Sequence, residues 1–269
     1  MRAFILAGGF ATRLWPLTEK MAKPLLPLAG KPIIDHILEQ IPPEMPVAVS
    51  TNAALQAGFQ EWVALQKRQR LSLVVEETRR DDQKIGALGA IAQWIETEQV
   101  QEDILLLTGD NYFGFPLQSF LQSYTSGTPL LAAYDIGDTD RARAFGTVLL
   151  HAGSSRIRAF EEKPAQPQTT LVSTGCSILP KEAHPVLLQF AREHPDNVGG
   201  IFEELLRNNW DIDCYTFTEQ WFDIGSFPSY LEATKALVGD QVLRGADVVT
   251  QRCTLEGSVV LGDHCVVEN

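Results

Sequence analysis

The sequence has little positive charge, and this shortage excludes one class of protein at once. Among 269 residues, 22 Lys and Arg stand against 34 Asp and Glu, which gives a formal net charge of −12. A sequence-independent nucleic-acid binder needs a basic face, so we expect no nucleic-acid partner. Anionic ligands would have to be held by a few well-placed Lys and Arg residues together with a divalent metal ion.

Cysteine is also scarce, and long apolar runs are missing. The four cysteines (Cys176, Cys214, Cys253 and Cys265) contain no C-x-x-C pair. Neither a zinc site nor a disulfide framework is therefore expected. No apolar run reaches the length of a membrane span, and the first residues lead directly into an expected strand without a signal-peptide core. We expect a cytoplasmic protein with no membrane partner.

The most informative stretch is residues 4–32. It begins with an apolar run, Phe4-Ile5-Leu6-Ala7, typical of a buried strand, and then breaks at Gly8-Gly9 into a loop that carries Thr12 and Arg13. Glycines let backbone N–H groups approach an anion, and a nearby basic side chain can neutralise its charge. Lys23 follows, oriented by Pro24 behind it. This pattern predicts a phosphate-binding loop.

Two common phosphate loops do not match this stretch. The P-loop requires a glycine and a Ser or Thr around Gly30-Lys31, where the chain has Leu25 and Pro32. The dinucleotide fingerprint fails because no third glycine follows Gly8-Gly9 before Gly30. A glycine turn in a structural α/β domain is the remaining non-functional interpretation.

The stretch FILAGGFATRLWPLTEKMAKPLLPLAGKP resembles the signature of the nucleotide-sugar pyrophosphorylases, which are sugar-1-phosphate nucleotidyltransferases. That signature reads G-G-x-G-T-R-L-x-P-L-T, followed by P-K-P-L-L-P-V-x-G-K-P. The chain departs from it at Ala11, Ala22 and Leu28. Of these, Ala11 replaces a glycine, and its Cβ could crowd the nucleotide or alter the loop. About thirty residues match, so we favour the family over a structural turn.

The pattern of apolar residues predicts an α/β fold. Strands expected at residues 47–50, 71–75 and 104–107 alternate with helices at 31–41, 52–69 and 86–98, with Asn52 as an N-cap. Such alternation indicates a parallel sheet with helices on both faces and ligands at the carboxyl ends of the strands. Successive strands at 130–134, 146–150, 156–160 and 171–178 then indicate a mixed sheet. The further expected elements are helices at 180–193, 201–209 and 226–239 and a strand at 212–217. The expected fold class is therefore α/β, with a Rossmann-like, mostly parallel mixed sheet.

Two aspartates are candidate metal ligands. Asp110 follows the apolar strand in the turn Gly109-Asp110-Asn111, where a carboxylate suits Mg²⁺ but a plain turn aspartate is equally common. The resemblance favours the metal, because the family has its metal-binding Asp in an L-G-D-N turn. It also implies that Asp223, in the segment W-F-D-I-G-S, is the second ligand of Mg²⁺.

Other assignments come from the same resemblance. The segments F-G-T-V, E-E-K-P and S-T-G resemble sugar-site motifs of the family. Arg13 and Lys23 are then the expected catalytic residues. The expected nucleotide-binding residues are Leu6, Ala7, Gly8, Gly9, Thr12, Glu77 and Gly86, and the expected sugar-phosphate-binding residues are Gly146, Glu161, Lys163 and Gly175.

The last thirty residues have a different pattern. Val249, Leu255, Leu261 and Val267 recur every six residues, and this spacing resembles the hexapeptide repeat of left-handed β-helices. We therefore expect a nucleotidyltransferase domain over residues 1–239 and a hexapeptide-repeat stub over 240–269. So short a stub leaves its faces open and could join the chain into a homo-oligomer.

The sequence thus predicts an enzyme that uses Mg²⁺ to convert an NTP and a sugar 1-phosphate, of glucose or mannose, into an NDP-sugar and pyrophosphate. Two alternatives stay open. One is a cytidylyltransferase acting on a phosphorylated amino alcohol, which would lack a sugar half. The other is a non-catalytic regulatory subunit that binds NDP-sugars, which would have lost some of Arg13, Lys23, Asp110 and Asp223.

Overall fold

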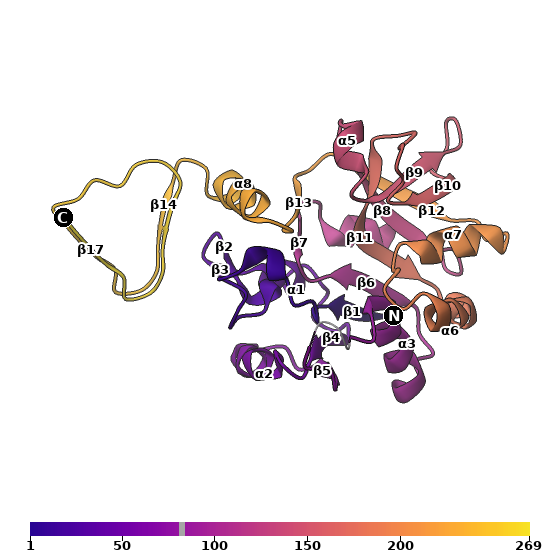
Figure 1. Ribbon diagram of the computed structural model, residues 1–269, viewed down its shortest axis with the longest axis horizontal. Coiled ribbons are helices and arrows are strands. Elements are labelled where there is room, and N and C mark those ends of the chain that lie inside the picture. Colours follow the sequence, from indigo (N-terminus) through magenta and orange to yellow (C-terminus); the bar gives the residue numbers. More distant parts are fainter. Residues whose placement is uncertain (81–83) are drawn as a thin grey trace.

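The computed structural model describes residues 1–80 and 84–269; residues 81–83, which overlap the charged loop expected from Arg79 to Asp82, lie outside this description. Strand β1 (Arg2–Leu6) lies at the centre of the main sheet (Figure 1). It pairs in parallel with β4 (Val47–Asn52) and β6 (Ile104–Thr108), and β4 pairs in parallel with β5 (Leu71–Glu76). Their carboxyl ends therefore meet at one edge of the sheet.

The second half of the sheet is mixed, as the sequence predicts. The long strand β11 (Leu171–Leu179) runs antiparallel to β6, to β8 (Leu130–Asp135) and to β9 (Gly146–Leu150). Strand β10 (Ile157–Glu162) extends this half beyond β9, and β12 (Asp213–Phe217) lies parallel to β8. The α/β class with a mixed, mostly parallel sheet is confirmed.

Helices cover both faces of the sheet (Figure 1). Alternation along β1 shows the two cores: Ala3 and Ile5 belong to one, and Phe4 belongs to the other. Because both faces are buried, the central strands are apolar runs rather than alternating patterns. One core includes residues of α1 (Ile33–Leu38), α2 (Gln56–Leu65) and α4 (Leu117–Gln122); the other includes residues of α3 (Ala87–Glu98), α6 (His184–Glu193) and α7 (Gly200–Arg207).

The expectation that Asn52 is a helix N-cap is wrong. Asn52 is the last residue of β4, and α2 begins four residues later. Its Oδ1 accepts hydrogen bonds from the N–H groups of Ala54 and Leu55, and its Nδ2 donates to the carbonyl of Gly8 at 2.7 Å. The side chain therefore caps a turn and holds the glycine loop, because Asn bonds neighbouring backbone groups in turns as readily as at helix ends.

Several short elements complete the fold. Strands β7 (Asn111–Phe113) and β13 (Trp221–Asp223) form an antiparallel pair beside the carboxyl edge of the main sheet. Neither was expected from the sequence, since three residues are too few to show a period. Further short elements of the described chain are β2 (Pro27–Leu28), β3 (Lys31–Pro32), α5 (Thr139–Ala142) and the 3-10 helices Thr12–Leu14, Lys23–Leu25 and Lys181–Ala183.

The C-terminal segment follows α8 (Phe227–Val238) and projects away from the sheet (Figure 1). Its strands pair in parallel, β14 (Val242–Arg244) with β16 (Val259–Leu261) and β15 (Val249–Gln251) with β17 (Val266–Glu268). In both pairs each residue lies opposite the one 17 positions later. Across the described residues, no helix has both the length and the apolar character needed to cross a membrane.

Candidate active site

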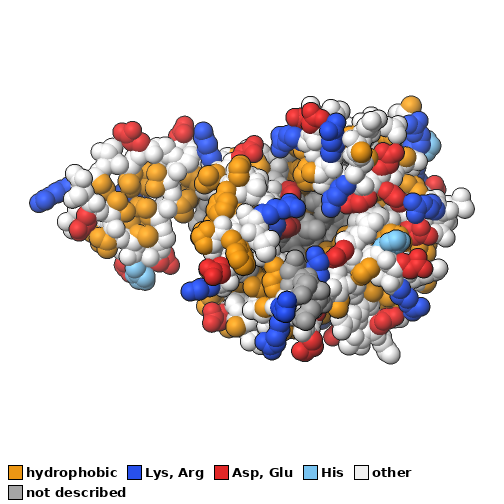
Figure 2. All heavy atoms as spheres, viewed as in Figure 1, with side chains coloured by type: hydrophobic (Ala, Val, Ile, Leu, Met, Phe, Trp, Pro, Cys, Tyr) orange, Lys and Arg blue, Asp and Glu red, His pale blue; other side chains and the backbone are white. Residues whose placement is uncertain are grey.

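Two cavities lie at the carboxyl edge of the sheet and meet at the end of β6. One, of about 270 Å³, is called here the distal cavity; the other, of about 250 Å³, is called the loop cavity because Gly8 and Gly9 line it. Thr108, Asp110 and Val198 line both. Figure 2 shows this face hollowed near its centre, with Lys and Arg side chains around the hollow. The cavities thus share a wall that carries a carboxylate.

The turn after β6 positions Asp110. The N–H of Gly109 donates to the carbonyl of Leu6 at 2.8 Å, and a Cβ on Gly109 would lie 2.9 Å from that oxygen. Glycine is therefore required for so close an approach. The Asn111 side chain donates to Asp110 Oδ1 at 2.9 Å, and Lys23 Nζ lies 2.5 Å from Asp110 Oδ2. Lys23 has just 15% of its side chain exposed, so this ion pair is largely shielded from water.

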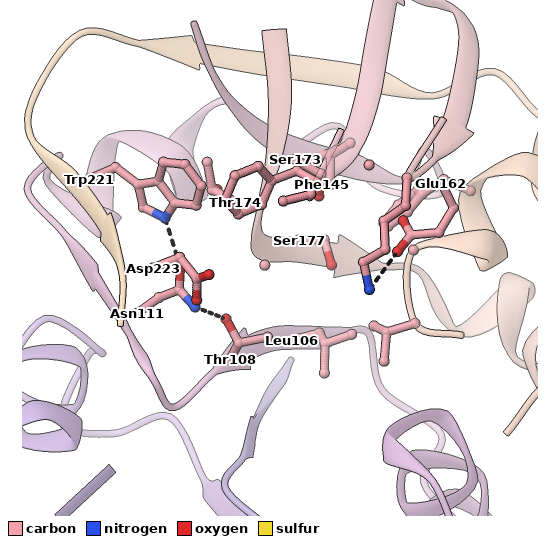
Figure 3. A pocket seen from close by; sticks show the side chains of 18 of the residues that line it. Leu106, Thr108, Asn111, Phe145, Glu162, Ser173, Thr174, Ser177, Trp221 and Asp223 are labelled. Atoms are coloured by element: carbon pink, nitrogen blue, oxygen red, sulfur yellow. Dashed lines mark hydrogen bonds and ion pairs between the residues drawn. The ribbon is translucent and has the colours of Figure 1, made fainter. Parts of the chain in front are cut away.

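Asp223 reaches the same cavity through the β7–β13 pair. It lies opposite Asn111, and the next residue, Ile224, donates its N–H to the carbonyl of Asp110 at 3.1 Å. The indole of Trp221 donates to Asn111 Oδ1, and Asn111 Nδ2 donates to Thr108 Oγ1, both at 2.8 Å (Figure 3). This chain of hydrogen bonds ties β13 to the end of β6, although the two strands are more than a hundred residues apart.

The two carboxylates interact. Burial, followed by the charge of Asp110, raises the pKa of Asp223 to about 6. Their donor set fits Mg²⁺, which takes few protein carboxylates and completes its shell with phosphate and water oxygens. Over the described chain no group of three or more His, Cys, Asp and Glu gathers to form a metal site. Any metal held by Asp110 and Asp223 would complete its shell with oxygens from water or a bound substrate.

The distal cavity contains three of the four residues assigned to the sugar phosphate: Gly146, Lys163 and Gly175. The fourth, Glu161, does not line it, and its neighbour Glu162 does (Figure 3). Successive side chains of β10 point to opposite faces, so a shift of one residue changes which glutamate faces the cavity. Glu161 instead accepts a hydrogen bond from Gln168 at 3.3 Å.

Glu162 is enclosed by glycines. A Cβ on Gly199 would lie 1.9 Å from Glu162 Oε2, and one on Gly146 would lie 2.8 Å from the same oxygen. Burial raises the pKa of Glu162, while Lys163, whose Nζ lies 3.6 Å from Glu162 Oε1, opposes the shift. A buried acceptor next to a cation suits a ligand that presents both hydroxyl groups and a phosphate.

The loop cavity contains Leu6, Gly8, Gly9 and Gly86, all assigned to the nucleotide. Ala7 is buried and does not line it. Glu77 is exposed and outside it as well; Glu76, the last residue of β5, faces the cavity instead. Glu76 ends β5 and Glu77 lies beyond the strand, so the end of the strand separates these two adjacent glutamates.

Comparison with known proteins decides the family. The family model described as nucleotidyl transferase matches residues 2–239. The chain belongs to this family.

Individual relatives are distant from this nucleotidyltransferase. A protein of Sulfolobus acidocaldarius assigned as a mannose-1-phosphate guanyltransferase is 25% identical over 275 residues, covering 98% of this chain and 72% of its own. The glucose-1-phosphate thymidylyltransferase of Streptomyces antibioticus is 24% identical, covering all of this chain and 75% of its own. Among solved structures, a UDP-glucose pyrophosphorylase complexed with UDP-glucose has a TM-score of 0.70 at 20% identity, with 88% of this chain and 97% of that chain covered.

Within this nucleotidyltransferase, Thr12 and Arg13 lie in the exposed loop after β1 and line neither cavity. The charge of Arg13 nevertheless contributes to lowering the pKa of Asp223, against the larger effect of burial. Ala11, in place of the family glycine, has the left-handed conformation, with φ 47° and ψ 43°. Its carbonyl accepts from Thr18 Oγ1 at 2.7 Å. The alanine therefore keeps the backbone shape that glycine adopts at less cost.

Several polar residues that line the cavities were missed from the sequence, among them two glutamates, Glu76 and Glu162. In both cases the adjacent glutamate was chosen from a Glu-Glu pair. For β10, the apolar neighbours could have indicated the right glutamate. Phe160 is buried in the core, and residues two apart on a strand share a face. That rule groups Glu162 with Phe160 and separates it from Glu161.

Proposed function

We propose that this chain transfers a nucleotidyl group from an NTP to a sugar 1-phosphate, that of glucose or mannose, and releases pyrophosphate. The observation that supports this most is the junction of the two cavities at Asp110. A nucleotide in the loop cavity and a sugar phosphate in the distal cavity would bring their phosphates together there. Orienting two reactants in this way is itself a large contribution to the rate.

The reaction needs little proton chemistry. An oxygen of the sugar phosphate attacks the α-phosphorus of the NTP, a new P–O bond forms, and the bond to the β-phosphate oxygen breaks. A phosphate monoester has a second pKa near ~6, so the nucleophile is already largely ionised at neutral pH. Catalysis then depends on positioning and on neutralising charge.

We assign the charges as follows. Lys23, paired with Asp110, would contact the reacting phosphates, Lys163 would contact the sugar phosphate, and Arg13 would close over the leaving pyrophosphate. Asp110 and Asp223 would hold Mg²⁺, which would neutralise phosphate charge when bound. Glu162 would accept hydrogen bonds from sugar hydroxyls.

Two features weigh against the alternatives. A cytidylyltransferase for phosphorylated amino alcohols would not need the walled distal cavity with Glu162 and Lys163. A non-catalytic subunit would have no reason to keep Arg13, Lys23, Asp110 and Asp223 together.

Pyrophosphate release, measured with four NTPs against the 1-phosphates of glucose, mannose and N-acetylglucosamine, tests the proposal. Tight NDP-sugar binding without pyrophosphate release from any pair would favour the regulatory subunit.

For the C-terminal segment, we propose a hexapeptide-repeat β-helix stub, separate from the catalytic domain of residues 1–239. The parallel pairs support this: they are offset by 17 residues, one fewer than the 18 residues of a coil made of three hexads. Val249 and Val266 are exposed at 41% and 63%, so the stub leaves an apolar surface open, which a second copy of the chain could cover. Deleting residues 243–269 should preserve turnover and reduce the particle size in light scattering. An unchanged particle size would argue against the oligomer.

A further inference from the structure

Glu76 is a buried carboxylate in the loop cavity that the reaction outlined above does not use. It is 9% exposed and ends β5 at the carboxyl edge of the sheet. Its contacts are long: Thr78 Oγ1 and the N–H of Ile85 both approach Oε2 at 3.4 Å. Over the described residues, Oε1 accepts no hydrogen bond. A buried carboxylate needs several donors, so the part of the chain that the structure describes satisfies this one poorly.

The surrounding chain makes room for this side chain and for a flat ligand beside it. A Cβ on Gly8 would lie 2.9 Å from Glu76 Oε1, so the glycine is required where the carboxylate sits. Asn52 holds the carbonyl of that glycine. Four of the other lining residues are small, namely Gly9, Gly86, Ala87 and Ala90.

Two further charged groups line this cavity. Lys84 Nζ and Asp196 Oδ2 lie 3.7 Å apart. Burial is the main cause that raises the pKa of Glu76, and Asp196 adds to it while Lys84 opposes it. A ligand that donates hydrogen bonds to this carboxylate would favour its charged form and relieve the cost of burying it.

The four bases differ in what they offer to a carboxylate. Guanine presents two adjacent donors, N1–H and the N2 amino group, which match the two acceptor oxygens. Uracil and thymine present one N–H between two carbonyls. Their carbonyl oxygens would repel the carboxylate oxygens, because both carry negative partial charge. Adenine and cytosine present an amino group beside an acceptor nitrogen. Guanine is thus the base whose edge pairs fully with an ionised Glu.

We propose that Glu76 selects guanine and that the NTP of this enzyme is GTP, an inference that rests on the proposed function. Glu76 would accept from N1–H and N2–H of the base, while the backbone at Gly8 and Gly9 and the small side chains enclose the ring. A bidentate contact of this kind discriminates between bases by about 10- to 100-fold. The competing interpretation is that Glu76 simply holds the segment between Thr78 and Ile85.

Glu76→Gln separates these two roles. The amide keeps an oxygen that can accept from Ile85, so a structural role should survive. Toward the base it now offers one donor and one acceptor, which matches uracil better than guanine. Glu77→Gln, on the exposed neighbour, is the matched control.

The experiment combines pyrophosphate release from GTP, ATP, CTP, UTP and dTTP with calorimetric titration of GDP and UDP. We expect the wild type and Glu77→Gln to prefer GTP by about 10-fold or more in kcat/KM, and Glu76→Gln to lose most of that preference and gain on UTP. The thermal midpoints of all three should be close. Turnover without a preference for GTP, or an unchanged GTP-to-UTP ratio in Glu76→Gln, would overturn the inference while leaving the proposed function intact. If no NTP yields pyrophosphate, the proposed function fails, and equal binding of GDP and UDP would then overturn the guanine assignment separately.

Discussion

The loop cavity and the distal cavity each enclose a glutamate, but they are built from different parts of the sheet. The first is built mainly from the ends of the parallel strands β1, β4, β5 and β6, the second mainly from the antiparallel strands β9, β10 and β11. Each encloses one glutamate at the last position of a strand, Glu76 on β5 and Glu162 on β10, next to a glycine without which the carboxylate would not fit. A buried acceptor framed by glycine can therefore arise at the end of either kind of strand.

Each cavity has a lysine among its lining residues, Lys163 in the distal cavity and Lys84 in the loop cavity, and a third lysine lies at the junction. Beside Glu162, the chain supplies Lys163 within the cavity itself. At the junction, Lys23 is paired with Asp110. This arrangement implies that substitutions at the junction affect both substrates, whereas those deep in one cavity affect one.

The largest effect should come from Asp223→Asn at the junction. Loss of this proposed Mg²⁺ ligand should lower kcat by roughly 10³-fold with any substrate pair, because several kcal/mol of charge stabilisation would be lost. Stability should be unchanged or slightly higher, since burial and Asp110 raise the pKa of this carboxyl. Steady-state kinetics over a range of Mg²⁺ concentrations and thermal denaturation measure the two effects. The control is Asp240→Asn, which removes the same charge at an exposed position. Normal turnover in Asp223→Asn would refute the shared metal site.

Arg13→Ala should lower kcat by about 10²–10³-fold with little change in NTP affinity. Its proposed contact is with pyrophosphate, on which charge accumulates in the transition state. Arg13→Lys should recover part of the loss. Rapid-quench kinetics combined with NTP titration would separate the two parameters, and a raised KM at wild-type kcat would disprove the assigned role.

Lys163→Ala sharpens the division between the cavities. We expect the KM for the sugar 1-phosphate to rise about 10- to 100-fold, the range for a lost hydrogen bond to a charged group, while NTP binding stays unchanged. Lys181→Ala, on a surface away from both cavities, is the control. Calorimetric titration of each substrate measures the split. Equal weakening of both ligands would mean that the cavities do not act separately.

The smallest effect concerns the loop itself. Ala11 has a positive φ, so Ala11→Gly should stabilise the protein by about 0.5–1 kcal/mol. This figure is the strain energy that glycine relieves in the left-handed region, less the conformational entropy that glycine adds to the unfolded chain. Ala57→Gly, at an exposed position in the first turn of α2, should instead destabilise it, by at most about 1 kcal/mol. Urea denaturation compares them. A loss of stability in both variants would mean that the left-handed conformation at Ala11 carries no strain.

Much of the chain could be predicted from local sequence. The apolar runs at β1 and β6 and the helical period of α3 depend on short-range patterns, and these elements lie close to where the sequence predicts them. The glycine loop and Asp110 follow β1 and β6 directly, so their place at the carboxyl edge follows from the parallel topology.

Other features were decided by the tertiary structure. The β7–β13 pair brings Asp223 to Asp110 through long-range hydrogen bonds. The local sequence does not predict this pair, because strands of three residues are too short to show a pattern. The choice of Glu162 over Glu161 depended on strand register, because a shift of one residue reverses every side chain, and the choice of Glu76 over Glu77 depended on where β5 ends. The sequence by itself thus determined the class of fold and the residue types proposed for the site, since short-range patterns encode both. Which glutamate faces each cavity, and which carboxylates meet, depended on pairing between distant segments.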